Sequence, residues 1–231
     1  MTNTIDAKKK AVGEKAVEYI QDGMILGLGS GSTVYWMLKK LEEYVKDGLV
    51  VKGVPSSLKT EGWAKEFGIP LVTLSEARRL DLAIDGADEV DSAFNLTKGG
   101  GGSLLREKLV NDAADRLIIV VDDSKLVKRL GAFPLPVEIV PFGWENTAEK
   151  IAALQCQPKL RRKDSEIFVT NNGNYIVDCE FNEITEPAAL HQNLKMILGV
   201  VETGLFINMA DIVLVSGESG VRILEKEEHH E

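Results

Sequence analysis

The sequence predicts an α/β protein with a doubly wound, Rossmann-like sheet and an inserted smaller α+β domain. Through 1–130, short apolar runs alternate with helical periodicities, which is typical of β-α-β units and a parallel sheet. Between 131 and 208 the order becomes β-α-β-β-α-β, the split pattern of a ferredoxin-like domain. The apolar run 212–215 then indicates one more buried strand, which we expect to return to the first sheet. We therefore expect a large α/β domain formed by 1–130 and 209–231, with the small domain at 131–208.

The composition is that of a globular chain with an acidic surplus. Of 231 residues, 44% are hydrophobic and 27% are charged. The formal net charge of −9 argues against a nucleic-acid partner, since such proteins usually carry a basic patch. Cys156 and Cys179 lack C-x-x-C spacing, so we expect no disulfide framework and a cytoplasmic location. We find no signal peptide or apolar run of membrane-spanning length, and we expect the charged tail 225–231 to be frayed.

The first β-α unit surrounds a glycine turn. A helix is expected at 6–20, and its Lys8-Lys9-Lys10 run is expected to face solvent, with a lysine that reaches the site as the alternative. The apolar run 24–28 predicts a strand, and the spacing over 34–45 predicts the next helix. The turn Gly29-Ser30-Gly31-Ser32-Thr33 therefore lies where nucleotide and phosphate sites form, between a strand and a helix N-terminus.

This turn fits a terminal phosphate better than a dinucleotide. The G-x-G-x-x-G fingerprint fails because Ser32 or Val34 stands where the third glycine belongs, and no Lys follows as in a Walker loop. The hydroxyls of Ser30, Ser32 and Thr33 suit a phosphate that also accepts helix amide hydrogens. A plain tight turn with a helix cap explains the same residues equally well.

The rest of the large domain places charged residues at the carboxyl ends of its strands. Strands are expected at 49–54, 71–73, 80–84 and 116–121, with helices at 60–67 and 104–110. Asp85 follows one of these strands and Lys125 follows another, so both lie at the sheet edge where ligands gather in open α/β sheets. A turn at Asp85-Gly86 and a solvated loop lysine are the structural alternatives.

The small domain shows weaker periodicity. Strands are expected at 137–140, 167–169, 175–177 and 200–205, with helices at 144–154 and 187–198. The two middle strands are expected to pair as a hairpin across Asn171-Asn172-Gly173-Asn174.

Four consecutive glycines, Gly99 to Gly102, stand between Lys98 and Ser103. Their backbone carries no Cβ atoms, so its N–H groups can close around an anion. Ser103 is a good N-cap for the helix that follows, and a helix N-terminus also favours negative charge. Together with the acidic stretch 85–91 just before it, this loop predicts a site for a small phosphorylated molecule.

Carboxylates and lysines carry the chemistry that the sequence offers. His191 is the only histidine outside the tail, and its place in a small-domain helix indicates a structural role, so a His-based triad or metal cage is hard to assemble. An aldose–ketose interconversion needs one base for the proton, groups that hold an oxyanion, and a distant anchor such as a phosphate site. Glu107 is the natural base because it lies near the helix start and the glycine loop. Its alternative is a first-turn glutamate that is favoured only by the helix dipole.

Three stretches in this order closely resemble ribose-5-phosphate isomerase of the A type: Gly29-Ser30-Gly31-Ser32-Thr33, Asp85-Gly86-Ala87-Asp88-Glu89-Val90-Asp91, and Lys98-Gly99-Gly100-Gly101-Gly102-Ser103-Leu104-Leu105-Arg106-Glu107-Lys108. The resemblance covers essentially the whole chain, and it is anchored by these motifs and by Lys125.

The resemblance implies an isomerase that interconverts D-ribose 5-phosphate and D-ribulose 5-phosphate through an enediolate, in the non-oxidative pentose phosphate pathway. It also implies that the enzyme needs no metal or other cofactor and forms a homodimer or homotetramer. By resemblance Glu107 is the base, Asp85 and Asp88 contact the sugar and assist ring opening, and Lys98 holds substrate and stabilises charge. The implied substrate-binding residues are Ser30, Gly31, Ser32, Thr33, Asp85, Gly86, Ala87, Asp88, Lys98, Gly99, Gly100, Gly101 and Lys125.

Two other classes of protein compete with this interpretation. A sugar-phosphate-binding sensor module could use the same type of sheet, but it would usually be joined to a helix-turn-helix, for which we expect no room before Ile5. A nicotinamide-dependent enzyme would need the missing third glycine and an acidic residue after the second strand. The acids around Asp85 could hold a divalent ion, but they lack EF-hand spacing, so we expect no required metal.

Overall fold

The computed structural model describes residues 4–226, which form two compact units. The first takes in the chain up to Ala87, Arg106–Lys125 and the chain from Met209, and the second takes in Asp88–Leu105 and Leu126–Asn208. The expected small domain, 131–208, falls inside the second unit, which also includes 88–105 and 126–130. The exact domain boundaries stay a prediction.

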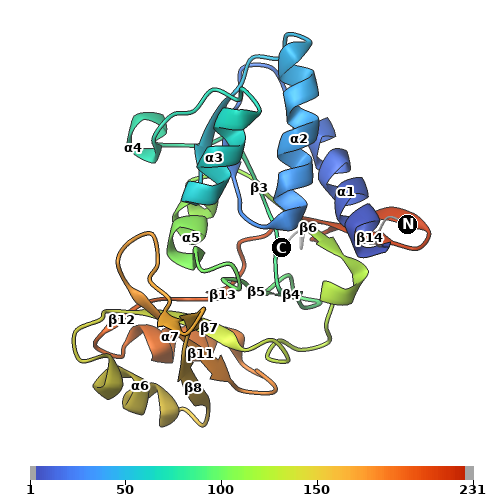
Figure 1. The fold of residues 1–231 in the computed structure, drawn as a ribbon. Coiled ribbons are helices and arrows are strands. Elements are labelled where there is room, and N and C mark those ends of the chain that lie inside the picture. Colours follow the sequence, from blue (N-terminus) through green and yellow to red (C-terminus); the bar gives the residue numbers. More distant parts are fainter. Residues whose placement is uncertain (1–3, 227–231) are drawn as a thin grey trace, which may run out of the picture. The chain divides into compact units, whose positions relative to one another are not determined.

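The first unit is built on a six-stranded sheet in the order β15-β14-β6-β3-β1-β2 (Figure 1). Its strands are β1 (Ile25–Leu28), β2 (Lys52–Pro55), β3 (Leu82–Asp85), β6 (Leu117–Asp122), β14 (Ile212–Gly217) and β15 (Gly220–Glu225). All neighbouring strands are parallel except β14 and β15, which form an antiparallel hairpin. The central strand β6 is buried along its whole length because helices cover both faces of a parallel sheet. The expected return of 212–215 to the first sheet is confirmed.

Helices pack on both faces of this sheet, as the doubly wound prediction requires. They are α1 (Thr4–Ala16), η1 (Val17–Tyr19), α2 (Ser32–Lys46), α3 (Leu58–Glu66), α4 (Leu74–Ala77), α5 (Leu104–Asp112) and η2 (Asp123–Lys125). Successive side chains of a strand point to opposite faces. Leu26 and Leu28 of β1 join the core cluster under α1 and α2, whereas a Cβ at Gly27 would lie 2.8 Å from Val110 of α5. A glycine here therefore lets α5 approach the sheet closely.

The second unit contains the ferredoxin-like arrangement. Its main sheet is antiparallel, in the order β12-β7-β11-β8, which corresponds to 4-1-3-2 along the β-α-β-β-α-β chain. The elements are β7 (Leu135–Ile139), α6 (Trp144–Ala152), β8 (Gln157–Leu160), β11 (Tyr175–Glu180), α7 (Pro187–Lys195) and β12 (Val200–Thr203). A smaller sheet, β13-β5-β4, joins Leu205–Phe206, Leu96–Thr97 and Glu89–Val90.

The expected hairpin partner of β11 was wrong. β11 lies between β7 and β8. Of the expected strand 167–169, only Ile167 lies in a strand, in the short ribbon that β9 (Arg162–Lys163) forms with β10 (Glu166–Ile167). β8 is an edge strand that contains Pro158 and alternates exposed with half-buried residues, so it lacks the apolar run by which strands are found.

Two further expectations differ from the structure. Residues 71–73 form only an isolated bridge between Gly53 and Leu71, because Thr73 instead caps α4 through a capping box with Glu76. β15 was not expected, because its residues are exposed or half-buried and so form no buried apolar run. The expected frayed tail, 225–231, lies outside the described residues from 227 onward. None of the helices within 4–226 is long and apolar enough to cross a membrane.

Candidate active site

Asp85 lies at the carboxyl end of β3 and is completely buried. Its Oδ1 accepts hydrogen bonds from the backbone N–H groups of Ser30 (3.0 Å) and Gly86 (2.8 Å), and its Oδ2 accepts from the Asn111 side chain (3.1 Å). A Cβ at Gly29 would lie 2.3 Å from Oδ1, so the glycine turn after β1 rests directly on this carboxylate. The structure therefore brings Asp85, Gly86 and the glycine turn together, as expected for neighbouring parallel strands.

A cluster of four hydroxyls stands beside the glycine turn. Ser30 Oγ lies 2.9 Å from Ser56 Oγ, 3.0 Å from Ser57 Oγ and 3.3 Å from Thr60 Oγ1. Thr60 in turn donates to the Gly29 carbonyl at 2.8 Å. Ser56, Ser57 and Thr60 were not expected as site residues. Their signal in the sequence was the position of Ser56-Ser57 directly after the second strand, at the same edge of the sheet.

The start of α2 has backbone N–H groups that no side chain caps. Gly31 is the N-cap with φ of 99°, a left-handed conformation that favours glycine, and it makes no side-chain capping bond. Gly31 and Ser32 are exposed and Thr33 is half-buried. N–H groups at a helix start favour an anion, and the phosphate site expected here stays a prediction.

Glu107 lies in the first turn of α5 and is only 5% exposed. Asn111 stands four residues later, on the same face of the helix, and reaches Asp85. The Glu107 carboxylate therefore lies one helical turn from the residue that binds Asp85. Asn111 was not expected, and sequence spacing from Glu107 was the signal that could have found it.

Lys125 ends η2, three residues after β6, and is half-buried. The same segment holds α1 in place, because Lys8 Nζ lies 2.7 Å from Asp123 Oδ1. This hydrogen bond raises the pKa of Lys8 and lowers the pKa of Asp123. Lys8 was expected to face solvent, but its side chain is only 21% exposed and paired, so that expectation was wrong for this member of the lysine run.

The second unit supplies the glycine loop. Gly99 and Gly102 are buried with φ of 103° and 84°, while Gly100 and Gly101 are exposed. The Gly100 N–H donates to Asp88 Oδ2 at 2.8 Å, so the structure brings these two expected residues together. Lys98 is 2% exposed, with Nζ 5.4 Å from the centre of the Phe206 ring, and its backbone N–H donates to Gly204. A buried ammonium held over an aromatic ring is a strong local positive charge.

Two acids of the stretch 85–91 have structural partners. Glu89 is 3% exposed, and its carboxylate accepts the N–H groups of Gly131 (2.9 Å) and Phe133 (2.8 Å). Asp91 closes a turn by accepting from Ala93 N, Asn95 N and the Asn95 side chain. Asp85 and Asp88 are thereby set apart as the carboxylates that face the glycine turn and the glycine loop.

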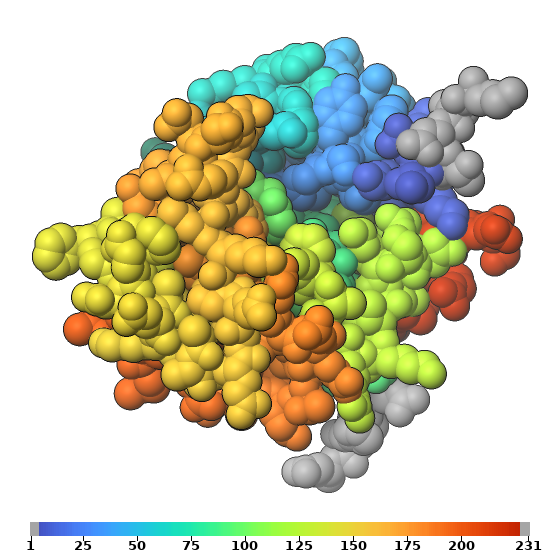
Figure 2. All heavy atoms as spheres, turned by 60° about the horizontal axis from the view of Figure 1, so that its bottom comes forward, coloured from blue at the N-terminus to red at the C-terminus, as the bar shows by residue number. Residues whose placement is uncertain are grey.

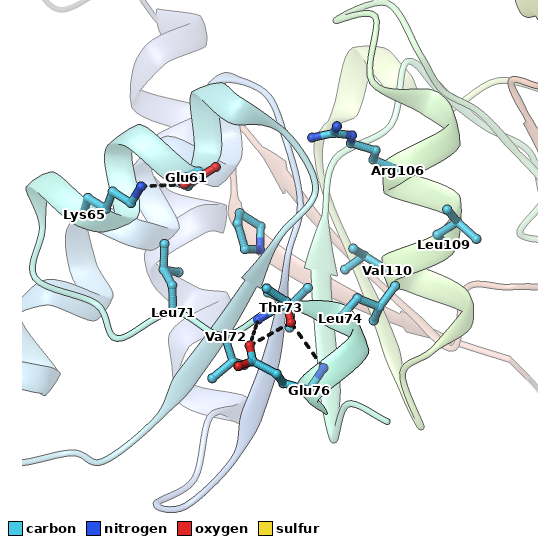
Figure 3. A pocket seen from close by; sticks show the side chains of 12 residues that line it. Glu61, Lys65, Leu71, Val72, Thr73, Leu74, Glu76, Arg106, Leu109 and Val110 are labelled. Atoms are coloured by element: carbon cyan, nitrogen blue, oxygen red, sulfur yellow. Dashed lines mark hydrogen bonds and ion pairs between the residues drawn. The ribbon is translucent and has the colours of Figure 1, made fainter. Parts of the chain in front are cut away.

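Figure 3 shows a cavity of about 370 Å³ in the first unit that none of the expected site residues lines. Its walls are mainly apolar, and Arg106 extends from α5 toward α3, where Glu61 and Lys65 form an ion pair. Arg106, which lines this cavity, directly precedes the expected base Glu107 in α5.

The donor set of the described residues gives no support to a metal centre. Within 4–226, no group of three or more His, Cys, Asp or Glu side chains is placed to hold a metal ion. His191 lies in α7 with Nδ1 2.8 Å from the Thr203 hydroxyl, in agreement with the structural role expected for it.

Known proteins resemble this chain over nearly its whole length. The family model of ribose 5-phosphate isomerase A (phosphoriboisomerase A) matches residues 52–220. A protein of Oceanobacillus iheyensis named ribose-5-phosphate isomerase A 1 is 52% identical over 222 residues, which cover 96% of this chain and 99% of the relative. The structure of ribose 5-phosphate isomerase A from Methanocaldococcus jannaschii gives a TM-score of 0.92 at 38% identity, covering 96% of this chain and 99% of that one. A D-ribose-5-phosphate isomerase in complex with phospho-erythronic acid gives a TM-score of 0.93 at 37% identity, with the same coverage of 96% and 99%.

Proposed function

The chain belongs to the ribose 5-phosphate isomerase A family and interconverts ribose 5-phosphate and ribulose 5-phosphate, and we propose that Glu107 carries the proton between C2 and C1 of the sugar. The observation that supports this role is a buried carboxylate in the first turn of α5, one turn from the residue that binds Asp85. The alternative of a sugar-phosphate sensor is not favoured, because the relatives over nearly the whole chain are isomerases.

In this proposal Glu107 removes the C2 proton from the open-chain aldehyde and returns it to C1 of the enediolate, while the hydroxyl proton of the C2 oxygen passes to the C1 oxygen. Negative charge develops on the oxygens of C1 and C2 at that moment. Lys98 and the Gly101 N–H of the glycine loop hold that charge, since a buried ammonium and an oriented amide act strongly where water is excluded.

The two aspartates take different parts. Three N–H donors occupy Asp85, so we assign it to the fixed wall of the site, with Gly86 and Ala87 beside the sugar. Asp88 binds the loop through Oδ2, and within residues 4–226 no donor to its Oδ1 is found. Asp88 Oδ1 is therefore the better candidate to exchange a proton with the sugar hydroxyls during ring opening.

We propose that the phosphate binds at the start of α2. Ser30, Gly31, Ser32 and Thr33 would bind it through hydroxyls and uncapped N–H groups, with Lys125 supplying charge from the same edge of the sheet. A phosphate held there anchors the sugar far from the reacting carbons, which is how binding energy contributes to positioning.

The test is Glu107→Gln, which keeps the shape of the side chain but cannot accept the proton. Loss of a general base typically lowers kcat by about 10² to 10⁴-fold. We expect kcat to collapse and solvent deuterium no longer to enter C2, while phospho-erythronic acid still binds by calorimetry. Glu149→Gln on the exposed surface of α6 is the matched control. Deuterium exchange at the wild-type rate in Glu107→Gln would assign the proton to another residue.

The assembly and location of the enzyme are further parts of the proposal. Large apolar side chains are exposed on the second unit: Phe142 (93%), Met196 (85%) and Leu198 (84%). They belong to the stretch 140–200, which is drawn in yellow to orange in Figure 2. Exposed apolar side chains of this size favour association, so we propose a homodimer or homotetramer in which they are covered by a second copy. Light scattering of the double variant Met196→Lys, Leu198→Lys should then give a lower mass.

Two buried free cysteines support a cytoplasmic location, and the net charge of −9 supports a small phosphosugar rather than nucleic acid as the partner.

A further inference from the structure

Arg161 stands directly after β8 and joins the sheet of the second unit to the glycine loop. Its Nε and one terminal nitrogen donate to the two carboxylate oxygens of Asp178 on β11. Its other terminal nitrogen donates to the carbonyls of Gly99 (2.8 Å) and Gly100 (3.2 Å). The side chain is 13% exposed, and the Arg161 backbone is itself fixed by bonds to Ile176 and Phe168. The guanidinium is therefore held rigidly against two successive peptide groups of the loop.

These two contacts, together with the Gly102 N–H that also donates to the Gly99 carbonyl at 3.0 Å, orient the N–H groups of the loop. The described chain contains no cis peptide, and in a trans peptide the C=O and N–H bonds point in opposite directions. The Gly99 carbonyl faces Arg161, so the Gly100 N–H of the same peptide faces away, and it does meet Asp88 Oδ2. By the same geometry the Gly100 carbonyl turns the Gly101 N–H away from Arg161. Gly101 is exposed, and a Cβ there would meet nothing within 4 Å.

We propose that Arg161 is a positioning residue for the isomerisation: it directs the Gly101 N–H toward the oxygen on which negative charge develops. It acts through the peptide groups and does not touch the sugar. A cation on the carbonyl side also polarises both peptides, and such polarisation strengthens the N–H donors on the far side. The inference rests on the proposed function only in taking this loop as the group that holds the enediolate.

The geometry requires arginine at this position. The planar fork reaches the two oxygens of Asp178 and still leaves a terminal nitrogen for the two carbonyls. A lysine offers one compact ammonium, which can reach a carbonyl or Asp178 but cannot hold both in a fixed orientation. Phe168 packs beside the guanidinium, 5.8 Å from ring centre to Cζ, and also against Gly102. The side chain is thus locked between the strand and the loop.

A merely structural Arg161 would tie the loop to β11 and influence only folding or substrate affinity. A positioning role predicts a loss that is larger for the charged intermediate than for the sugar. Phospho-erythronic acid carries a planar carboxylate where the sugar carries its reacting carbons, so it reports on groups that bind such an anion. Inorganic phosphate reports on the phosphate site alone.

The experiment compares Arg161→Met and Arg161→Lys with the control Arg162→Met, whose exposed side chain bonds only the Ser165 carbonyl of its own turn. We expect Arg161→Met to lower kcat about 10-fold or more, since a fully lost oxyanion donor costs about 10² to 10³. KM should change less than kcat. Phospho-erythronic acid should bind correspondingly more weakly, while inorganic phosphate binds as in the wild type. Arg161→Lys should recover part of the loss, and Arg162→Met should match the wild type.

The binding measurements are repeated in the Glu107→Gln background, where they do not depend on which residue takes the proton. A loss of affinity for phospho-erythronic acid there supports the role of Arg161 even if Glu107 is not the base. Affinity and kcat within twofold of the wild type in folded Arg161→Met would overturn the proposal. If Arg161→Met does not fold, the affinity and kcat of Arg161→Lys are compared with the wild type by the same criterion. Equal losses of affinity for phosphate and for phospho-erythronic acid would contradict the positioning role and show a general loosening of the protein.

Discussion

Asn111 donates its side-chain amide hydrogen to Oδ2 of Asp85 across a distance of 3.1 Å. Asn111 is 3% exposed, and its own Oδ1 is buried without a hydrogen-bond partner within residues 4–226. The helix that carries the proposed base thus also orients a second carboxylate of the site. This contact has a cost, because an unpaired buried carbonyl oxygen is unfavourable.

Asn111→Leu tests the support that Asn111 gives to the Asp85 carboxylate and the cost of its own unpaired oxygen. The loss of a hydrogen bond to a charged group, about 1.5 to 3 kcal/mol, should lower kcat/KM about 10- to 100-fold. The thermal midpoint should fall, because the buried Asp85 carboxylate loses a donor, and removal of the unpaired Asn111 oxygen offsets only part of that cost. Steady-state kinetics and a thermal scan check both, with Asn146→Leu on exposed α6 as the control. Wild-type kcat/KM would show that Asp85 needs no support from α5.

Gly100→Ala should disturb the glycine loop through steric contacts of the added Cβ, without backbone strain. The φ of Gly100 is not left-handed, but an added Cβ would lie 2.9 Å and 3.0 Å from the Asp88 oxygens and 3.0 Å from the Phe133 ring. We expect kcat/KM to fall about tenfold or more, as the Gly100–Asp88 bond is displaced. Gly62→Ala within α3 has open space around its Cβ and should instead stabilise the protein by about 0.5 to 1 kcal/mol. Unchanged kinetics in Gly100→Ala would mean that Asp88 moves without consequence.

Thr33→Ala tests the phosphate site at the start of α2. Removing one hydrogen bond to a charged group should raise KM by a factor that corresponds to roughly 1 kcal/mol or more, while kcat stays close to the wild type. Thr60→Ala, which removes the hydroxyl that binds the Gly29 carbonyl, should lower thermal stability as well. An unchanged KM for folded Thr33→Ala would place the phosphate at the Gly99 loop.

The Lys8–Asp123 pair should make stability depend on pH at both extremes. The pKa of Asp123 is lowered by its hydrogen bond to Lys8, so its contribution is present above its unfolded pKa and is lost as the pH falls through the folded value. The pKa of Lys8 is raised, so its contribution is lost as the pH rises through that value. The difference in thermal midpoint between Lys8→Met and the wild type should therefore be largest near neutral pH. A constant difference across the range would show that the pair contributes through packing alone.

The two thiols should react unequally. The hydrogen bond between the two thiols lowers the pKa of Cys156. The same hydrogen bond, together with burial, raises the pKa of Cys179. A thiol reagent should therefore modify Cys156 first and slowly in the native enzyme, and both cysteines quickly in denaturant. Cys156→Ser and Cys179→Ser assign the two phases. Faster reaction of Cys179 would contradict this order.

The large sheet was predictable because its strands are apolar runs that are buried on both faces. Leu117–Asp122 shows this plainly, and Asp85 and Lys125 could be placed at one edge from strand direction alone. β8 and β15 escaped because edge strands expose polar residues and leave no periodic signal.

The motifs indicated where the site residues lie but not what supports them. Nothing in the pattern around Arg161 distinguishes it from a surface residue, and only its spacing from Glu107 marks Asn111, since each acts through a partner that is distant in sequence. Glu89 shows the converse. It lies in the acidic motif, and only the structure shows that it binds the backbone of Gly131 and Phe133.

The position of β14 beside β6 has a consequence for synthesis of the chain. A ribosome releases β6 long before β14, because the whole stretch from Leu126 to Asn208 lies between them. During that interval the apolar edge of Leu117–Asp122 can pair with β3 on one side only. An open strand edge of this kind can pair with other nascent chains. The last strands to leave the ribosome thus close the first sheet, and a truncated translation product that ends before Ile212 would leave this apolar edge of β6 unpaired.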